Sequence, residues 1–179
     1  NLRVPIICME PAVKKSHDLS HNDALKTLVI ATPVTVNGAK LKELITNLNA
    51  KDKSELLALP RLVNFAEKAE FKSENVKSYL KEELAKFDLS KFDFLVLGCT
   101  HFNYFKDSLR EILPANISII DGNEGTIKRL ISELGLAVSN VNLTPNVKFF
   151  YSGEEVCEQS ELEKISRNLA RLEKMRAIS

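Results

Sequence analysis

The sequence predicts an α/β protein built on a mostly parallel sheet. Short apolar runs alternate with segments whose apolar residues recur at helical spacing, from one end of the chain to the other, and this alternation is typical of doubly wound folds. The most apolar run, residues 94–97, leads straight into a glycine, as expected for a strand buried on both faces. A hydrophobic fraction of 44% over 179 residues provides enough apolar surface for a sizeable core.

The individual elements follow from local patterns along the chain. Pro5 places the first apolar run at the edge or the start of a strand. Thr35 is expected to cap a helix whose apolar stripe runs from Leu41 to Leu48, and Gly135 to end a later helix as its C-cap. The expected strands are residues 4–7, 25–31, 56–59, 92–97, 117–120 and 147–151, and the other expected helices include residues 12–18, 61–67, 74–87, 105–112, 127–134 and 162–172.

Composition argues against several classes of function. The formal net charge is +1 with acids and bases intermixed, whereas a nucleic-acid-binding protein needs a basic stripe, and no apolar run approaches the length of a membrane span. Three widely spaced cysteines argue against a disulfide framework and for a reducing compartment. The sequence has no P-loop, dinucleotide-binding or metal-ligand spacing, and His17 and His21 with their acidic neighbours do not form a convincing ligand set.

The chemistry is expected directly after the central strand, at Cys99, Thr100 and His101. In open α/β sheets the ligand lies outside the carboxyl ends of the strands, and Gly98 allows a sharp turn or a close approach there. Cys99 is open to three interpretations: a nucleophile, a proton carrier, or an inert buried residue. His101, two residues on, is expected on the same side of an extended backbone, where its imidazole would lower the thiol pKa. Thr100 and the start of the following helix suit a carboxylate.

Gly98-Cys99-Thr100-His101, preceded by Leu-Val-Leu, resembles the second catalytic segment of the bacterial glutamate racemases. Four further stretches resemble family segments in the right order, which makes the match specific. They are residues 5–14 (PIICMEPAVK), residues 30–36 (IATPVTV), residues 119–122 (IIDG) and residues 149–153 (FFYSG).

The resemblance implies a cofactor-independent mechanism in which two cysteines on opposite faces of glutamate exchange its Cα proton. Cys99 would be the second of the pair, acting on the L-enantiomer, and His101 would tune it. Thr100 and His101 would bind the substrate, and Thr32 and Thr35 would line the pocket, with the choice between these two left open. The family further implies a cytoplasmic enzyme without a metal, which supplies D-glutamate for peptidoglycan, with a homodimer as one assembly open to it.

The resemblance also implies two α/β lobes with the active site in the cleft between them. Residues 13–120 would be the second lobe, and residues 1–12 and 121–179 would be an incomplete remnant of the first. The family's first catalytic cysteine, with its Asn-Thr pair, and its N-terminal substrate-binding segments are absent, and the chain begins with Asn1 rather than Met. We therefore expect the chain to be the later part of a longer enzyme, with exposed apolar surface that favours association.

The sequence departs from the family pattern after the histidine, and its other two cysteines are assigned no catalytic role. The family usually has a proline a few residues after the histidine, whereas this chain has Asn103, which is expected to cap the following helix. Cys8 falls at a position that is not catalytic in the family and is interpreted as structural, and Cys157 as a surface or packing thiol. The alternatives are an aspartate- or hydantoin-type racemase of the same superfamily, which His101 disfavours, and a non-catalytic amino-acid-binding remnant, which the missing first cysteine favours.

Overall fold

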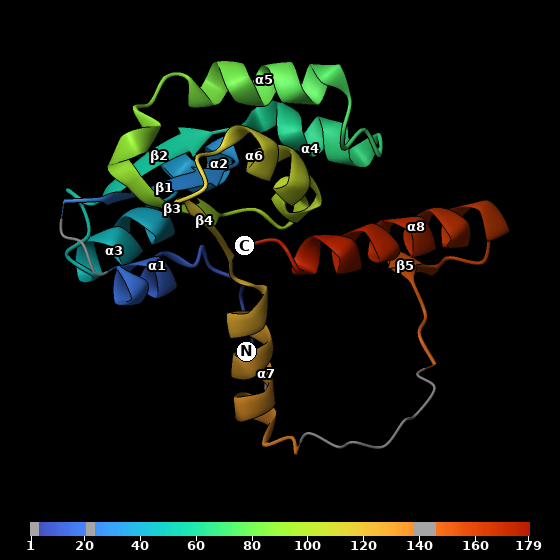
Figure 1. The fold of residues 1–179 in the computed structure, drawn as a ribbon. Coiled ribbons are helices and arrows are strands. Elements are labelled where there is room, and N and C mark those ends of the chain that lie inside the picture. Colours follow the sequence, from blue (N-terminus) through green and yellow to red (C-terminus); the bar gives the residue numbers. More distant parts are fainter. Residues whose placement is uncertain (1–3, 21–23, 138–145) are drawn as a thin grey trace.

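A computed structural model describes residues 4–20, 24–137 and 146–179. Its centre is a parallel four-stranded sheet with the strand order β2-β1-β3-β4 (Figure 1), so the α/β prediction is confirmed. The strands are β1 (Lys26–Ala31), β2 (Ser54–Ala58), β3 (Phe92–Leu97) and β4 (Ser118–Asp121). Each lies within a few residues of a predicted strand, because buried parallel strands leave a recognisable apolar run in the sequence.

Helices cover both faces of this sheet. Alternate side chains of each strand point to opposite faces, so Leu95 and Leu97 join one core cluster while Val96, between them, joins the other. Figure 1 shows one set of helices over one face and a second set over the other, in agreement with the two core clusters. The first set is α4 (Pro60–Glu67), α5 (Glu74–Leu84) and α6 (Lys106–Ile112), and the second is α1 (Val13–Leu19) and α3 (Ala39–Asn47).

The strand order creates a switch point between β1 and β3. From β1 the chain passes to β2 on one side, then returns to place β3 on the other side of β1 and β4 beyond it. In open α/β sheets such a point marks the expected ligand-binding crevice, at the carboxyl ends of the two central strands. Ile30 of β1 and Leu97 of β3 are paired in register, so Thr32 and Cys99 follow their strands at this same crevice.

The flanking segments lack a comparable core. Figure 1 shows α7 (Asn123–Leu134) running away from the sheet, and α8 (Gln159–Arg176) crossing beside it. Among the residues that the structure describes, α7 has no buried residue and α8 has only Met175, whereas every other buried apolar residue lies between Val13 and Ile120. The flanks therefore carry apolar side chains, such as Ile127, Leu134 and Leu169, that are exposed among the described residues.

Three predicted local features are wrong. Residues 4–7 form no strand, and the strand predicted for residues 147–151 is reduced to β5 (Phe150–Tyr151), which pairs only with β6 (Glu154–Glu155) in an exposed hairpin. Isolated two-stranded hairpins gain little from burial, which explains the short pairing. Thr35 does not cap the long helix: it lies inside the short α2 (Pro33–Asn37), and α3 begins after Gly38.

Gly135 ends α7 as predicted, with a left-handed φ of 58°. Within the described ranges, no helix has the length and apolar character to cross a membrane.

Candidate active site

The candidate site at the switch point depends on a close approach of backbone at Gly98. The Gly98 N–H donates to the Ile30 carbonyl at 2.8 Å, which continues the ladder past the end of β3. A Cβ atom on Gly98 would lie 2.9 Å from the Ala31 Cβ and 3.4 Å from Pro11. The glycine is therefore required by close packing rather than by an unusual φ angle. It brings Cys99 alongside the turn that follows β1.

That turn holds the two predicted threonines. Thr32 caps α2: its Oγ1 accepts from the Thr35 backbone N–H at 3.4 Å, and the two hydroxyl oxygens lie 3.1 Å apart. Thr32 has the extended backbone of a cap residue, and Pro33 occupies the first helical position. Both threonines are half-buried. They therefore present a pair of hydroxyl groups at the crevice.

Cys99 and His101 are in contact as predicted, but not through the extended backbone that the prediction assumed, because Thr100 and His101 lie in a 3₁₀ helix. Cys99 Sγ lies 3.9 Å from His101 Nδ1, a long contact for a thiol and an imidazole, and His101 Nε2 lies 2.8 Å from Glu67 Oε1 at the end of α4. A carboxylate only accepts hydrogen bonds, so Nε2 carries the proton and Nδ1 is left free to accept one from the thiol. The three groups form a relay from sulfur through imidazole to carboxylate.

Glu67 is the member of this relay that sequence reasoning missed. It lies on a different helix, and nothing in the residues around it marks it as functional. Its side chain is 68% exposed, against 36% for His101. Only the packing of α4 against the turn after β3 brings the two side chains into contact.

The pKa of the Cys99 thiol is raised above its ordinary value, which is the opposite of the direction predicted from the sequence. Burial of the half-buried thiol is the larger cause, and it outweighs the backbone N–H groups of His101 and Phe102, which stabilise the thiolate. The resting chain therefore holds Cys99 as a thiol at neutral pH. Removal of its proton requires a nearby base, and His101 Nδ1 occupies that position.

The remaining site residues lie on η2 (Thr100–Phe105), a 3₁₀ helix. Thr100 is exposed at its start, and His101 projects toward α4. Asn103 does not cap the next helix as predicted. It is buried, and its side-chain amide donates to the Thr100 carbonyl at 3.1 Å, bracing the turn that carries the site residues.

The other two cysteines differ from Cys99 in their exposure to solvent. Cys8 and Cys157 are both exposed, and all three cysteines are free thiols. Within residues 4–20, 24–137 and 146–179, no group of three or more His, Cys, Asp and Glu side chains is arranged to hold a metal ion. His21 lies outside the described residues.

Comparison with known proteins identifies the family. The chain is 92% identical over 178 residues to the glutamate racemase of Campylobacter concisus, and the match covers 99% of this chain and 68% of that enzyme. The chain belongs to the glutamate racemase family. Its members are isomerases that act on an amino acid, and this chain spans about two thirds of the length of that relative. No family model matches the chain.

Solved glutamate racemases share the fold. The Escherichia coli glutamate racemase, solved with L-glutamate and the activator UDP-MurNAc-ala, superposes with a TM-score of 0.71 at 22% identity, over 94% of this chain and 63% of the other. The Francisella tularensis glutamate racemase, solved with D-glutamate, gives a TM-score of 0.55 at 30% identity, over 63% of this chain and 43% of the other.

Proposed function

We propose that Cys99 is one of two cysteine acid/base groups that interconvert L- and D-glutamate, and that Cys99 acts on the L-enantiomer. The observation that carries the proposal is the Cys99–His101–Glu67 relay at the switch point of the sheet, in a chain of the glutamate racemase family. The site residues are Cys99 and His101 for proton transfer, and Thr32, Thr35, Thr100 and His101 for substrate binding.

The proposed proton transfer proceeds in balanced steps. His101 Nδ1 takes the Cys99 proton, and the Glu67 carboxylate stabilises the imidazolium that results. The thiolate then removes the Cα proton of L-glutamate: an S–H bond forms, a Cα–H bond breaks, and the electron pair stays on Cα. A thiol on the opposite face donates a proton to that carbon, which inverts its configuration. Cys99 thus returns to the thiol, His101 has gained one proton and the opposite thiol has lost one. Return of the His101 proton to the opposite thiolate, through solvent, resets both groups for the next turnover, and no cofactor takes part.

The hydroxyl-lined crevice suits the charged ends of an amino acid. The Thr32 and Thr35 hydroxyls lie within hydrogen-bonding distance of each other, so each has capacity left for a ligand oxygen or nitrogen. Thr100 adds an exposed hydroxyl on the side of Cys99. Oriented donors around the α-carboxylate would stabilise the charge that develops when Cα loses its proton.

The second base is proposed to come from outside these 179 residues. Cys8 and Cys157 are exposed, and the Campylobacter concisus relative has about a third of its length with no match in this chain. We propose that this unmatched part carries the first cysteine and completes a lobe to which residues 1–12 and 121–179 belong. Residues 13–120 would form the second lobe, with glutamate bound in the cleft between the two.

The proposed role is supply of D-glutamate for peptidoglycan synthesis in the cytoplasm, as the family resemblance implies. The uncovered apolar surface of α7 and of the β5–β6 hairpin suits closure by the rest of the enzyme. A homodimer of the completed enzyme is the assembly we propose.

Cα exchange in heavy water tests the proposal. L-glutamate would be incubated with the purified chain, and with the chain plus a separately expressed polypeptide covering the unmatched third of the Campylobacter concisus relative. Proton NMR would follow Cα deuterium, and circular dichroism would follow inversion. Cys99→Ser is the test variant and Cys157→Ser its matched control. L-aspartate and a hydantoin would be offered in parallel.

We expect exchange and inversion of glutamate only when both polypeptides are present, with loss of both in Cys99→Ser and neither affected by Cys157→Ser. Racemisation by the chain alone would place the second base within these residues and overturn that part of the proposal. Preference for aspartate or a hydantoin would reassign the substrate. Glutamate binding without any exchange in the combined sample would indicate a non-catalytic binding protein.

A further inference from the structure

We propose that the C-terminal helix α8 is a positioning element for the active site, and that Arg171 holds the turn carrying Thr100 and His101 in place. Arg171 touches neither Cys99 nor His101 through any described contact. Its contacts are with Tyr104, near the end of η2, and with Asp107, which follows η2 directly. The inference rests on the proposed function, because that function gives the turn its chemical role.

The η2 turn needs external support. Six residues of 3₁₀ helix exceed the run of about three to four that this geometry normally sustains. η2 passes directly into α6 (Lys106–Ile112), so the change from 3₁₀ to α geometry falls at its end. The start of the turn is braced by the Phe102 N–H, which donates to the Cys99 carbonyl at 3.1 Å, and by Asn103. Its end is continued by α6 and is also contacted by a side chain from elsewhere in the chain.

Arg171 provides that support with several contacts at once. Its Nε and Nη2 donate to the Tyr104 carbonyl at 3.1 and 2.7 Å, and Nη2 also lies 2.8 Å from Asp107 Oδ1. The guanidinium carbon lies 4.8 Å from the centre of the Phe71 ring, which itself stacks on Tyr104 at 4.9 Å. The Arg171 side chain is only 16% exposed.

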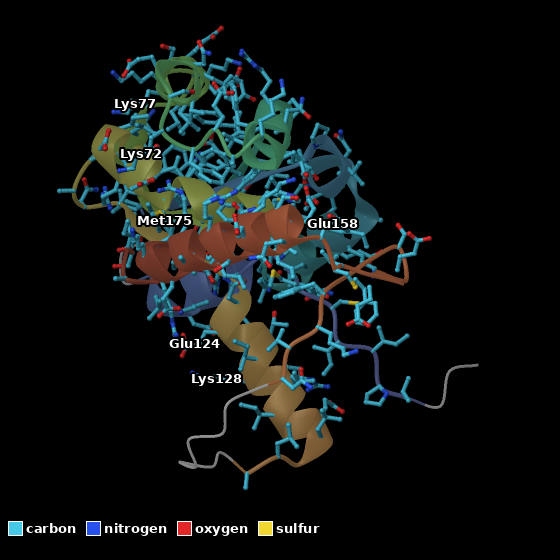
Figure 2. The ribbon with its side chains drawn as sticks, turned by 90° about the vertical axis from the view of Figure 1, so that its right-hand side faces the viewer. Lys72, Lys77, Glu124, Lys128, Glu158 and Met175 are labelled. Carbon is cyan, nitrogen blue, oxygen red and sulfur yellow. The ribbon has the colours of Figure 1, made fainter. Side chains whose placement is uncertain are left out.

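Neighbouring contacts hold α8 in the same place. Met175 is buried, and the buried Lys106 ammonium donates to the Ile178 carbonyl at 3.1 Å while pairing with Asp121 at 2.7 Å. Asp107 is shared between Arg171 and Lys72. Burial alone would raise the pKa of Asp107, but hydrogen bonds from Lys72 and Arg171 hold it below its ordinary value. Figure 2 shows α8 crossing the body of the protein, with Met175 on the helix and Lys72 above it.

The direction in which the pKa of the Cys99 thiol moves when Arg171 is removed distinguishes a displaced turn from an unfolded one. The His101 and Phe102 N–H groups on the turn stabilise the Cys99 thiolate, while burial opposes it. If Arg171 is lost and the turn loosens around a thiol that remains buried, the thiolate loses those donors and its pKa rises further. If the turn unfolds, burial is lost and the pKa falls toward its ordinary value. The ionisable side chain beside the thiol is His101; Glu67 contacts His101 on its far side, and Tyr104 lies close enough to Glu67 for that carboxylate to raise its pKa.

The test is the pH dependence of Cys99 alkylation by iodoacetamide, resolved by peptide mass spectrometry, with the exposed Cys8 and Cys157 as internal references. The variants are Arg171→Met, which keeps an apolar side chain but removes the charge, and Arg171→Lys, which keeps one charged donor group. Arg167→Met on the same helix is the matched control, because Arg167 is 71% exposed and pairs only with Glu163 in this structure. Amide hydrogen exchange of residues 100–105 would be measured on the same samples.

We expect Arg171→Met to move the Cys99 profile to higher pH and to speed exchange in residues 100–105. Alkylation of Cys99 at pH 7 is expected to slow about tenfold, because the thiolate is the reacting form and its fraction falls about tenfold for each unit by which the thiol pKa rises. Arg171→Lys is expected to fall between Arg171→Met and the wild type, with Arg167→Met unchanged. A Cys99 profile that overlays the wild type, or moves to lower pH, would overturn the proposal.

A folding check and a ligand-protection measurement serve as controls. If Arg171→Met fails to fold by far-ultraviolet circular dichroism, the profile of Arg171→Lys decides by the same criterion. Protection of wild-type Cys99 by glutamate reports on the proposed function separately. Absence of protection would count against glutamate as the ligand, while the Arg171 variants would still report on the turn.

Discussion

Residues 13–120 and the segments that flank them use the same kind of amphipathic pattern with different results. In the first region the apolar faces of α4 and α5 are buried against the sheet. In the second, α7 presents Ile127 and Leu134 to solvent, at 56% and 51% exposure. Apolar residues at helical spacing therefore predict an amphipathic helix, but they do not predict whether its apolar face is buried.

The same contrast separates two ways of fixing an element. β3 is held by register pairing on both sides and by packing on both faces. α8 has one buried residue, Met175, and is attached through polar contacts from Arg171 and to the Ile178 carbonyl. The first kind of attachment is hydrophobic and depends on burial, whereas the second depends on a few charged groups. Substitutions in the two regions should therefore have very different effects.

The largest effect is expected from Leu95→Ala. Leu95 is fully buried in the central strand, and truncation of a core leucine costs about 2–5 kcal/mol because a cavity remains. Leu134→Ala is the matched control: its side chain is 51% exposed on α7, and the expected change is within about 0.5 kcal/mol. Urea denaturation measures both. Equal losses would mean that α7 is covered in solution and would break the comparison.

The next effect is expected where the two regions meet, at Lys106. Its side chain is 6% exposed and pairs with Asp121, which is 17% exposed, at 2.7 Å. Lys106→Met leaves a largely buried carboxylate without its cation, which costs about 3 kcal/mol. Lys15→Met removes an ion pair whose side chains are 51% and 62% exposed and should leave the unfolding midpoint unchanged. A Lys106 variant as stable as the wild type would show that the junction contributes nothing to folding.

Alanine substitutions of two glycines, one in each region, are expected to change the stability of the protein in opposite directions. Gly98→Ala places a Cβ 2.9 Å from the Ala31 Cβ, and relief of that contact is expected to cost about 1–3 kcal/mol. Gly125 lies inside α7 with open space around it, so Gly125→Ala is expected to stabilise the helix by about 0.5–1 kcal/mol. Thermal unfolding followed by circular dichroism measures both. Destabilisation by Gly125→Ala would indicate a close contact at α7.

The smallest effect is expected at the relay, as a change in titration. Burial raises the pKa of the Cys99 thiol, so its alkylation midpoint should lie above that of the exposed Cys157. A raised thiol pKa stabilises the fold at low pH, and this contribution is lost as pH rises through the folded-state value. Glu67→Gln weakens stabilisation of the His101 imidazolium, and an exposed pair of this kind moves the Cys99 midpoint upward by about half a unit or less.

Glu43→Gln, an exposed carboxylate on the opposite side of the sheet, is the control for that substitution and should leave the midpoint of Cys99 in place. A midpoint for Cys99 at or below that of Cys157 would instead support the lowered pKa that the sequence predicts. An unchanged midpoint in Glu67→Gln would remove Glu67 from the relay.

Residues 4–7 and 147–151 show why some strands could not be predicted. Both are short apolar runs of the kind that marked β1 and β3 correctly, yet the first forms no strand and the second forms only β5 in an exposed hairpin. A strand needs a partner for its backbone groups, and an apolar run does not say where that partner is. The caps were predicted wrongly at Thr35 and Asn103 because a capping residue depends on where the helix begins, and the residue type alone does not fix that position.

By itself the sequence determined the α/β alternation, the buried central strand, and the placement of Cys99 and His101 together after it. These depend on local periodicity and on spacing, which are written in consecutive residues. The tertiary structure decided that Glu67 reaches His101, that burial raises rather than lowers the pKa of the Cys99 thiol, and that Arg171 supports the turn between them. Each of these depends on which distant surfaces pack together, and contacts and desolvation between such surfaces leave no pattern in the neighbouring residues.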